Sequence, residues 1–182
     1  HLHIDTACGR EPLPAMRQIA KDWGFNLVEI PIAPPGLEQQ SQWLQIRQAK
    51  ADWVTFWGAG AGMSGTAITG AARVGFPRNK IIFVTFGGAE EDMIAGGAQA
   101  KDTHVVAMVL PGKQFPLIAD IEKVVYGAGK GNMQNPARVG TIYYNRGVIA
   151  AVNYVEAMRN AQKIHNKVGQ PVTGAEFRDG YE

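Results

Sequence analysis

Two hydrophobic repeats alternate along the first two-thirds of the chain. Continuous apolar runs such as Ile81-Ile82-Phe83-Val84 are typical of buried strands. Between these runs, apolar residues recur every three or four positions, as they do from Leu13 to Trp23 before Gly24. The alternation predicts strands at residues 1–5, 26–32, 53–57, 80–86 and 104–110, and helices at residues 11–23, 38–50, 64–74 and 90–95.

Five strands joined by crossover helices predict an α/β fold. We expect a five-stranded parallel sheet in a three-layer α/β/α arrangement, with strand order 2-1-3-4-5 and both faces covered. Ligands of such sheets bind beyond the carboxyl ends of the strands. In this chain, that edge is predicted to consist of residues 6–10, 58–62 and 85–89.

The final third of the chain follows a different pattern. Helices are predicted at residues 114–126, 145–164 and 173–182, with a glycine-rich loop at 127–135 and almost no strands. The longest helix has an apolar face formed by Val148, Ile149, Val152, Val155, Ala157 and Met158. We therefore divide the chain into an α/β ligand-binding lobe at 1–112 and a helical segment at 113–182 from another, truncated lobe. A dimer or swapped assembly is one way to cover this apolar face.

Composition narrows the functional classes. Hydrophobic residues make up 46% and charged residues 19% of 182 residues, which is typical of a globular protein. The net charge of +2 gives no basic patch for nucleic acid. The single cysteine, Cys8, cannot form an internal disulfide or a multi-cysteine metal site. The chain starts without Met and directly in a strand, and it stops at Arg178-Asp179-Gly180-Tyr181-Glu182 just as a helix begins, so we expect both ends to be cut.

Several short motifs lie in a characteristic order along nearly the whole chain. They are Ala7-Cys8-Gly9-Arg10-Glu11, Gln39-Gln40-Ser41-Gln42-Trp43-Leu44, Ala71-Ala72-Arg73-Val74-Gly75-Phe76-Pro77, Gly87-Gly88-Ala89-Glu90 and Tyr144-Asn145-Arg146-Gly147-Val148. With them the chain resembles the second half of the periplasmic solute-binding proteins of ABC importers, of the branched-chain amino acid type. The resemblance implies a type I periplasmic binding fold with two lobes. It also implies a non-enzymatic protein without a cofactor, located in the periplasm or tethered by lipid outside the membrane. Its partners would be a membrane permease and a small solute, namely an amino acid, amide or carboxylate, held in a cleft between the lobes.

Carried onto this sequence, the family pattern places ligand contacts in the loops after the strands. These residues are Cys8, Trp57, Gly58, Ala59, Gly60, Thr85, Phe86 and Gly87, with Tyr143 and Tyr144 contributing from the other lobe. The sequence departs from the family in having Cys8 where Tyr is common, and in having no carboxylate near Thr85 unless Glu90 reaches back. Because a buried ammonium needs a charge partner, the solute is then not necessarily an α-amino acid.

Other chemistry fits the sequence less well. The glycine pattern from Gly60 to Gly65 fits a dinucleotide fingerprint, but the next strand ends without the required carboxylate. Ser64 fits an N-cap better than a nucleophile, because the nucleophile-elbow pattern fails at Thr66. A Cys8–histidine pair and a metal site at His1 and His3 each lack further partners.

The roles of Trp57 and Arg146 are left with two alternatives each, and two rival functions are considered. Trp53 is predicted to lie in the core, and Trp57 either in the core or against ligand. Arg146 either holds the lobe crossing or meets a ligand carboxylate. The main rival function is a cytoplasmic ligand-sensing domain of a regulator with the same fold, and an NAD-linked enzyme is the weaker one.

Overall fold

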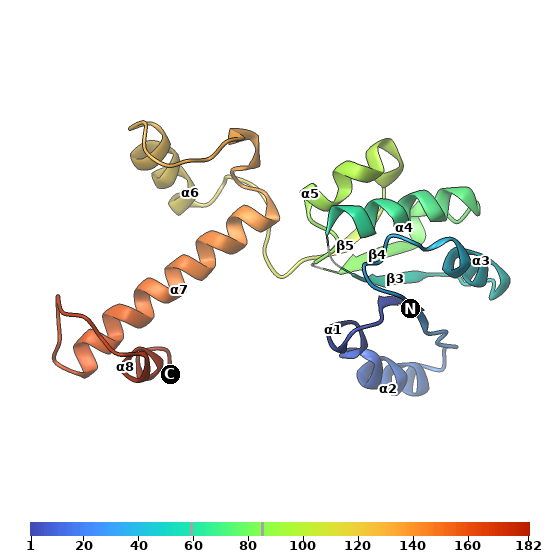
Figure 1. Cartoon of the computed structure of the whole chain (residues 1–182), viewed down its shortest axis with the longest axis horizontal. Helices are drawn as coiled ribbons and strands as arrows, with labels where there is room; N and C mark the ends of the chain where they lie inside the picture. Colours follow the sequence, from blue (N-terminus) through green and yellow to red (C-terminus); the bar gives the residue numbers. More distant parts are fainter. Residues whose placement is uncertain (59, 85) are drawn as a thin grey trace. The chain divides into compact units, whose positions relative to one another are not determined.

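The computed structural model describes residues 1–58, 60–84 and 86–182 (Figure 1). The chain divides into two compact units, His1–Met108 and Val109–Glu182.

The first unit alternates strands and helices, as the sequence predicts. Its strands are β1 (Leu2–Ile4), β2 (Ile30–Ile32), β3 (Val54–Trp57), β4 (Ile81–Val84) and β5 (His104–Val106). Its helices are α1 (Ala7–Arg10), α2 (Leu13–Trp23), α3 (Gln40–Gln48), α4 (Ala61–Arg73) and α5 (Glu90–Met93), with 3₁₀ segments η1 (Arg78–Lys80) and η2 (Ile94–Ala100).

The strands form one sheet of order β2-β1-β3-β4-β5, and every neighbouring pair is parallel. The predicted fold class and strand order are therefore confirmed. The strands themselves are shorter than the apolar runs suggest. For example, β2 was predicted from residue 26 but pairs only over Ile30–Ile32, where the three residues of β1 face it.

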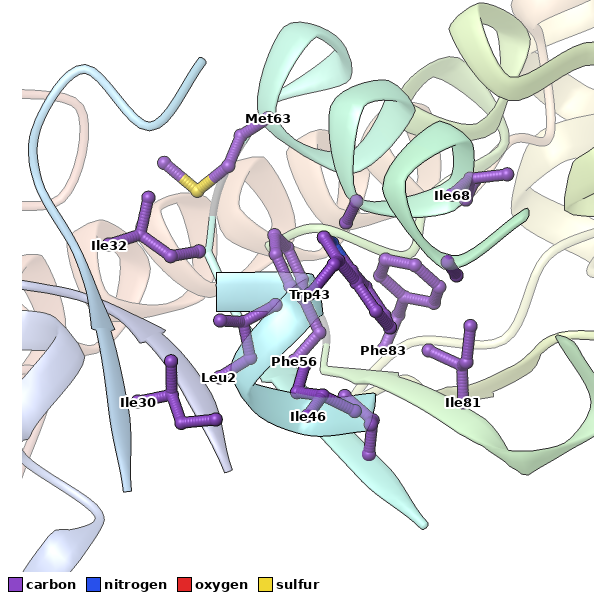
Figure 2. Packing of buried hydrophobic residues seen from close by; sticks show 13 residues of the cluster. Leu2, Ile30, Ile32, Trp43, Ile46, Phe56, Met63, Ile68, Ile81 and Phe83 are labelled. Carbon is purple, nitrogen blue, oxygen red and sulfur yellow. The ribbon is translucent and has the colours of Figure 1, made fainter. Parts of the chain in front are cut away.

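The core of the first unit lies on one face of the sheet. Side chains at paired positions of adjacent strands share that face, and the register couples Leu2 with Phe56 and Phe56 with Phe83. Trp43 and Ile46 of α3, together with Met63 and Ile68 of α4, cover them (Figure 2). Gly70 lets α4 approach α3 closely, because a Cβ there would overlap the Trp43 ring.

The opposite face is covered less completely than predicted. Burial alternates along β3 and β4, so Thr55, Trp57, Ile82 and Val84 are only half-buried, whereas His3 is buried. This face of the sheet is therefore covered in part, whereas the other face is covered fully.

Trp53 does not lie in the core, which corrects its predicted position. It precedes β3, and 47% of its surface is exposed. The Lys80 ammonium nitrogen lies 4.3 Å from the centre of its ring, and the His104 ring centroid lies 6.0 Å away. A flanking cation and a second ring suit an exposed tryptophan at the end of a strand.

The second unit is helical, and it contains no strand within residues 109–182. Its elements are α6 (Pro116–Ile121), the π-helical turn η3 (Glu122–Tyr126), the 3₁₀ turn η4 (Pro136–Arg138), α7 (Ile142–Ile164) and α8 (Gly174–Asp179). α8 packs against the C-terminal part of α7, where Gly180 lies against Ala157 and Ala161 (Figure 1).

The long helix begins three residues earlier than predicted. Thr141 is its N-cap, and the Thr141 hydroxyl accepts from the Tyr144 amide at 3.4 Å. Much of its predicted apolar face is exposed in this chain, including Ile149, Val152, Val155 and Met158.

Candidate functional site

The candidate site lies where β1, β3 and β4 end. Because these strands are parallel neighbours, the loops that follow them lie along one edge of the sheet. The chain turns into α1 after β1, into α4 after β3, and towards α5 after β4. The edge is also the switch point of the sheet, since the chain leaves β1 for β2 on one side and returns to β3 on the other.

The loops after β3 and β4 are joined directly. The Gly60 amide donates to the Phe86 carbonyl at 3.1 Å, and the Gly87 amide donates to the Val84 carbonyl at 2.8 Å. Gly87 packs so closely that an added Cβ would lie 3.0 Å from the Gly58 carbonyl oxygen. The structure thus brings Gly58, Gly60, Phe86 and Gly87 together as the sequence predicts.

Ser64 ties helix α4 to the loop after β4, a role that sequence reasoning missed. Its hydroxyl donates to the Gly87 carbonyl at 2.8 Å, and the side chain is fully buried. Ser64 was predicted to be an N-cap, but α4 starts at Ala61 with Gly60 as its N-cap. Gly60 has φ +84°, which glycine adopts readily, so the helix can begin earlier than the serine signal indicates.

The short helix that follows the first strand contributes an exposed thiol. Cys8 lies in α1, whose N-cap Thr6 accepts from the Gly9 amide at 3.3 Å. Asp5 and Arg10 form an exposed ion pair beside it. Gly9 packs on β1 with no room for a side chain, so it fixes the position of α1.

Aromatic side chains line the same edge. Trp57 is half-buried as the last residue of β3, and Phe86 is 37% exposed after β4. Ala59 and Thr85, also predicted site residues, lie outside the described residues. The buried Asp92 carboxylate accepts from the Ala89 amide at 3.1 Å, so it caps the first turn of α5.

Tyr143 and Tyr144 belong to the second unit, in the first turn of α7. The Tyr144 hydroxyl lies 3.1 Å from the Tyr126 hydroxyl. Burial, and then this hydrogen bond, raise the pKa of Tyr144 to about 12, so the phenol stays neutral at physiological pH.

Two hollows lie away from this edge, on the helical side of the first unit. One, of about 580 Å³, follows α3 and α4 past Trp43, Arg47, Thr66 and Arg73. The other, also about 580 Å³, lies beside Gly75, Arg78 and Asp102. Ligand sites of parallel sheets lie at the switch point, so the strand edge remains the candidate site.

A model of the periplasmic binding protein family matches residues 1–182. The chain belongs to this family. The strand order of the sheet agrees with this membership, because the structural relatives of the chain have the type I periplasmic binding protein fold. No curated protein sequence matches the chain.

Several solved structures share the fold of this chain. The chain is 36% identical, with a TM-score of 0.87, to a protein from the Pseudomonas fluorescens group described as an ABC transporter permease, with 98% of this chain and 42% of that one covered. A branched-chain amino acid ABC transporter from Thermus thermophilus with bound valine is 18% identical, with a TM-score of 0.75 over 98% of this chain and 45% of that one. A fatty acid ABC transporter substrate-binding protein from Thermomonospora curvata is 16% identical, with a TM-score of 0.75 over 100% of this chain and 44% of that one.

The periplasmic binding chain spans less than half of the length of each of these structures. Among its described residues, no helix is both long and apolar enough to cross a membrane. Within the same residues, no group of three or more His, Cys, Asp or Glu side chains could hold a metal ion.

Proposed function

We propose that this chain forms part of the extracytoplasmic solute-binding component of an ABC importer of the branched-chain amino acid type. Family membership over residues 1–182 is the observation that carries the proposal. Such a component hands a small solute to a membrane permease and catalyses no reaction. A location in the periplasm, or on a lipid tether outside the membrane, follows from that role.

The solute is proposed to bind at the carboxyl edge of β1, β3 and β4. Described residues proposed to contact it are Cys8, Trp57, Gly58, Gly60, Phe86 and Gly87. Ala59 and Thr85 complete the proposed set, although they lie outside the described residues. The glycines allow backbone amides to approach a solute oxygen closely, and the two rings offer apolar surface.

Uncharged side chains at this edge favour a particular class of solute. None of the six described contact residues carries a charge, and burial of an ammonium without a counter-charge is costly. Backbone N–H groups donate to amide and carboxylate oxygens but cannot accept from an ammonium, so we propose an amide or a carboxylate with an apolar part in preference to an α-amino acid. The solutes named for the structural relatives include an α-amino acid, valine, and an apolar carboxylate, a fatty acid.

Residues 113–182 are proposed to belong to a second lobe whose sheet lies outside this chain. The regular elements of this segment are all helical, yet Ile149, Val152, Val155 and Met158 of α7 are exposed. Exposed apolar side chains in a row on one helix indicate a surface that packs against something else. Tyr143 and Tyr144 at the start of α7 are proposed to contact the solute from that lobe.

A titration with matched tryptophan variants tests the site. Amides, carboxylates and α-amino acids are added to the protein, and Kd is measured by calorimetry for wild type, Trp57→Ala and Trp53→Ala. Both tryptophans belong to the same strand region, but only Trp57 lies at the carboxyl end. We expect Trp57→Ala to raise Kd about tenfold, or about 1.4 kcal/mol, and Trp53→Ala to leave it unchanged.

Two results would contradict the proposal in different ways. Equal loss of affinity, or none, in both variants would place the site elsewhere. Tight binding of α-amino acids would leave the site standing but refute the solute class.

A further inference from the structure

Asn145 occupies an unusual position in the first turn of α7. Its side chain is buried, with 3% exposed. The amide nitrogen lies 3.0 Å from the Leu110 carbonyl oxygen, 3.0 Å from that of Gly112 and 3.4 Å from that of Gly140. Carbonyl oxygens only accept, so the amide nitrogen and not the amide oxygen must face them.

The backbone reinforces this contact. The Gly112 amide donates to the Gly140 carbonyl at 2.6 Å. Gly112 has φ +111° and Gly140 has φ +91°, values that glycine tolerates and other residues rarely adopt. The segment 110–112 is therefore fixed to the turn before α7 by one side chain and one backbone bond.

On the N-terminal side of segment 110–112, the chain is held by its place in the sheet. Val106 is the last residue of β5, where it pairs with Val84 of β4. The first compact unit ends at Met108, two residues later. Only residues 107–109 separate the last paired residue of the sheet from the first residue held by Asn145.

We propose that Asn145 is a positioning residue that confines the joint between the two units to residues 107–109. The inference rests on the proposed function, in which movement of one lobe against the other encloses the solute. A joint of three residues limits the orientations that the open state samples. Less conformational entropy is then lost when the lobes close on a solute.

Hydrogen exchange of the unmodified protein provides the first test. The Gly112 amide is expected to exchange at least about tenfold more slowly than the amides of Met108 and Val109. The measurement needs no variant and no solute. Equal exchange rates across residues 108–112 would overturn the proposal.

Distances between two spin labels provide the second test. In a Cys8→Ser background, labels are attached through Lys21→Cys on α2 and Lys163→Cys on α7, both exposed positions on helices of different units. Asn145→Ala is expected to broaden the distance distribution. Asn160→Ala is the matched control, since Asn160 lies on the same helix and its amide contacts only the Gly180 carbonyl, at 3.5 Å, in the described part of the chain.

A pH profile separates positioning from simple structural support. In Asn145→Asp, a carboxylate would face three carbonyl oxygens at neutral pH, so the distribution should be broad. Acid protonates the carboxyl, which can then donate one hydrogen bond, and the distribution should narrow towards wild type.

The outcomes are distinct from those of the solute titration, because no solute is present. Folded Asn145→Ala and Asn145→Asp proteins with wild-type distributions at every pH would overturn the proposal. If circular dichroism shows that neither variant folds, the exchange rates of the unmodified protein decide.

Discussion

Gly9 holds α1 against the end of β1 beside the candidate site. A Cβ at this position would overlap the Ile4 carbonyl oxygen, which is fixed in the sheet. We expect Gly9→Ala to lower the free energy of unfolding by about 3 kcal/mol, since backbone must move to relieve the overlap. Gly147→Ala in α7 is the control, because no atom lies within 4 Å of its added Cβ. Urea denaturation should show that control to be stabilised by about 0.5–1 kcal/mol.

Ser64 offers a second measurement at a single residue. Ser64→Ala removes the buried donor to the Gly87 carbonyl and leaves that oxygen without its partner. We expect a loss of about 1–3 kcal/mol in the free energy of unfolding. Thr66→Ala, on the same helix, removes a hydroxyl bonded to Gly62 four residues earlier and should cost under about 1 kcal/mol. Similar costs for both variants would show that Ser64 does not hold the loop.

Residue roles were the least accessible to sequence reasoning. Glycines and aromatic residues after the strands were identified, because strand ends can be located from hydrophobic runs. Asn145 was missed, because two of its three acceptors lie 33 and 35 residues earlier and no local pattern links them to it. Trp53 was misplaced for a related reason, since alternation along a strand gives its face but not where the covering helices end.

The end of a helix was predicted well where a local residue such as glycine stops it. The end of a strand was predicted less well, because it depends on how far the neighbouring strand pairs with it. α2 ends at Trp23 as expected, since Gly24 adopts φ +72° after it. β5 was predicted to reach residue 110 but ends at Val106. Within the described residues its ladder with β4 covers Ile82–Val84, so the strand is shorter than the apolar run that predicted it.

The carboxylate at the start of α8 leads to a prediction about how stability depends on pH. The Glu176 carboxylate accepts from Lys167 at 2.6 Å and from the Thr173 amide at 2.7 Å. These bonds, with the Lys167 side chain the larger cause, lower the pKa of Glu176 to about 2. A lowered pKa stabilises the folded state above the unfolded value of about 4.5, and that stabilisation is lost as pH falls towards 2.

Hydrogen exchange of α8 measures this effect against Glu176→Gln. The difference in protection between wild type and the variant should be constant above about pH 4.5 and should vanish near pH 2. Other carboxyl groups titrate in both proteins and therefore cancel in the comparison. A difference that stays constant down to pH 2 would contradict the assigned cap.

At the scale of the whole molecule, the sheet order was predictable and the coverage of the apolar surfaces was not. Right-handed crossovers restrict a βαβαβ chain to few topologies, and the observed order is one of them. Coverage depends on which residues are available to pack, and half-buried Trp57, Ile82 and Val84 show that one sheet face is covered only in part. α7 likewise exposes its apolar row.

The apolar row on α7 gives the last prediction, which concerns the proposed second lobe. In a protein that carries both lobes, Val152 should be buried by the sheet of the proposed second lobe. Val152→Asp would then place a charge in an apolar interface and cost about 3 kcal/mol or more in the free energy of unfolding. In the 182-residue chain, where 39% of Val152 is exposed, the same change should cost under about 1 kcal/mol. Asn153→Asp introduces the same charge at the next, exposed position and should be nearly neutral in both proteins. Denaturant titration of the six proteins gives the answer: a small cost of Val152→Asp in the longer protein would mean that residues 113–182 do not pack on a second sheet.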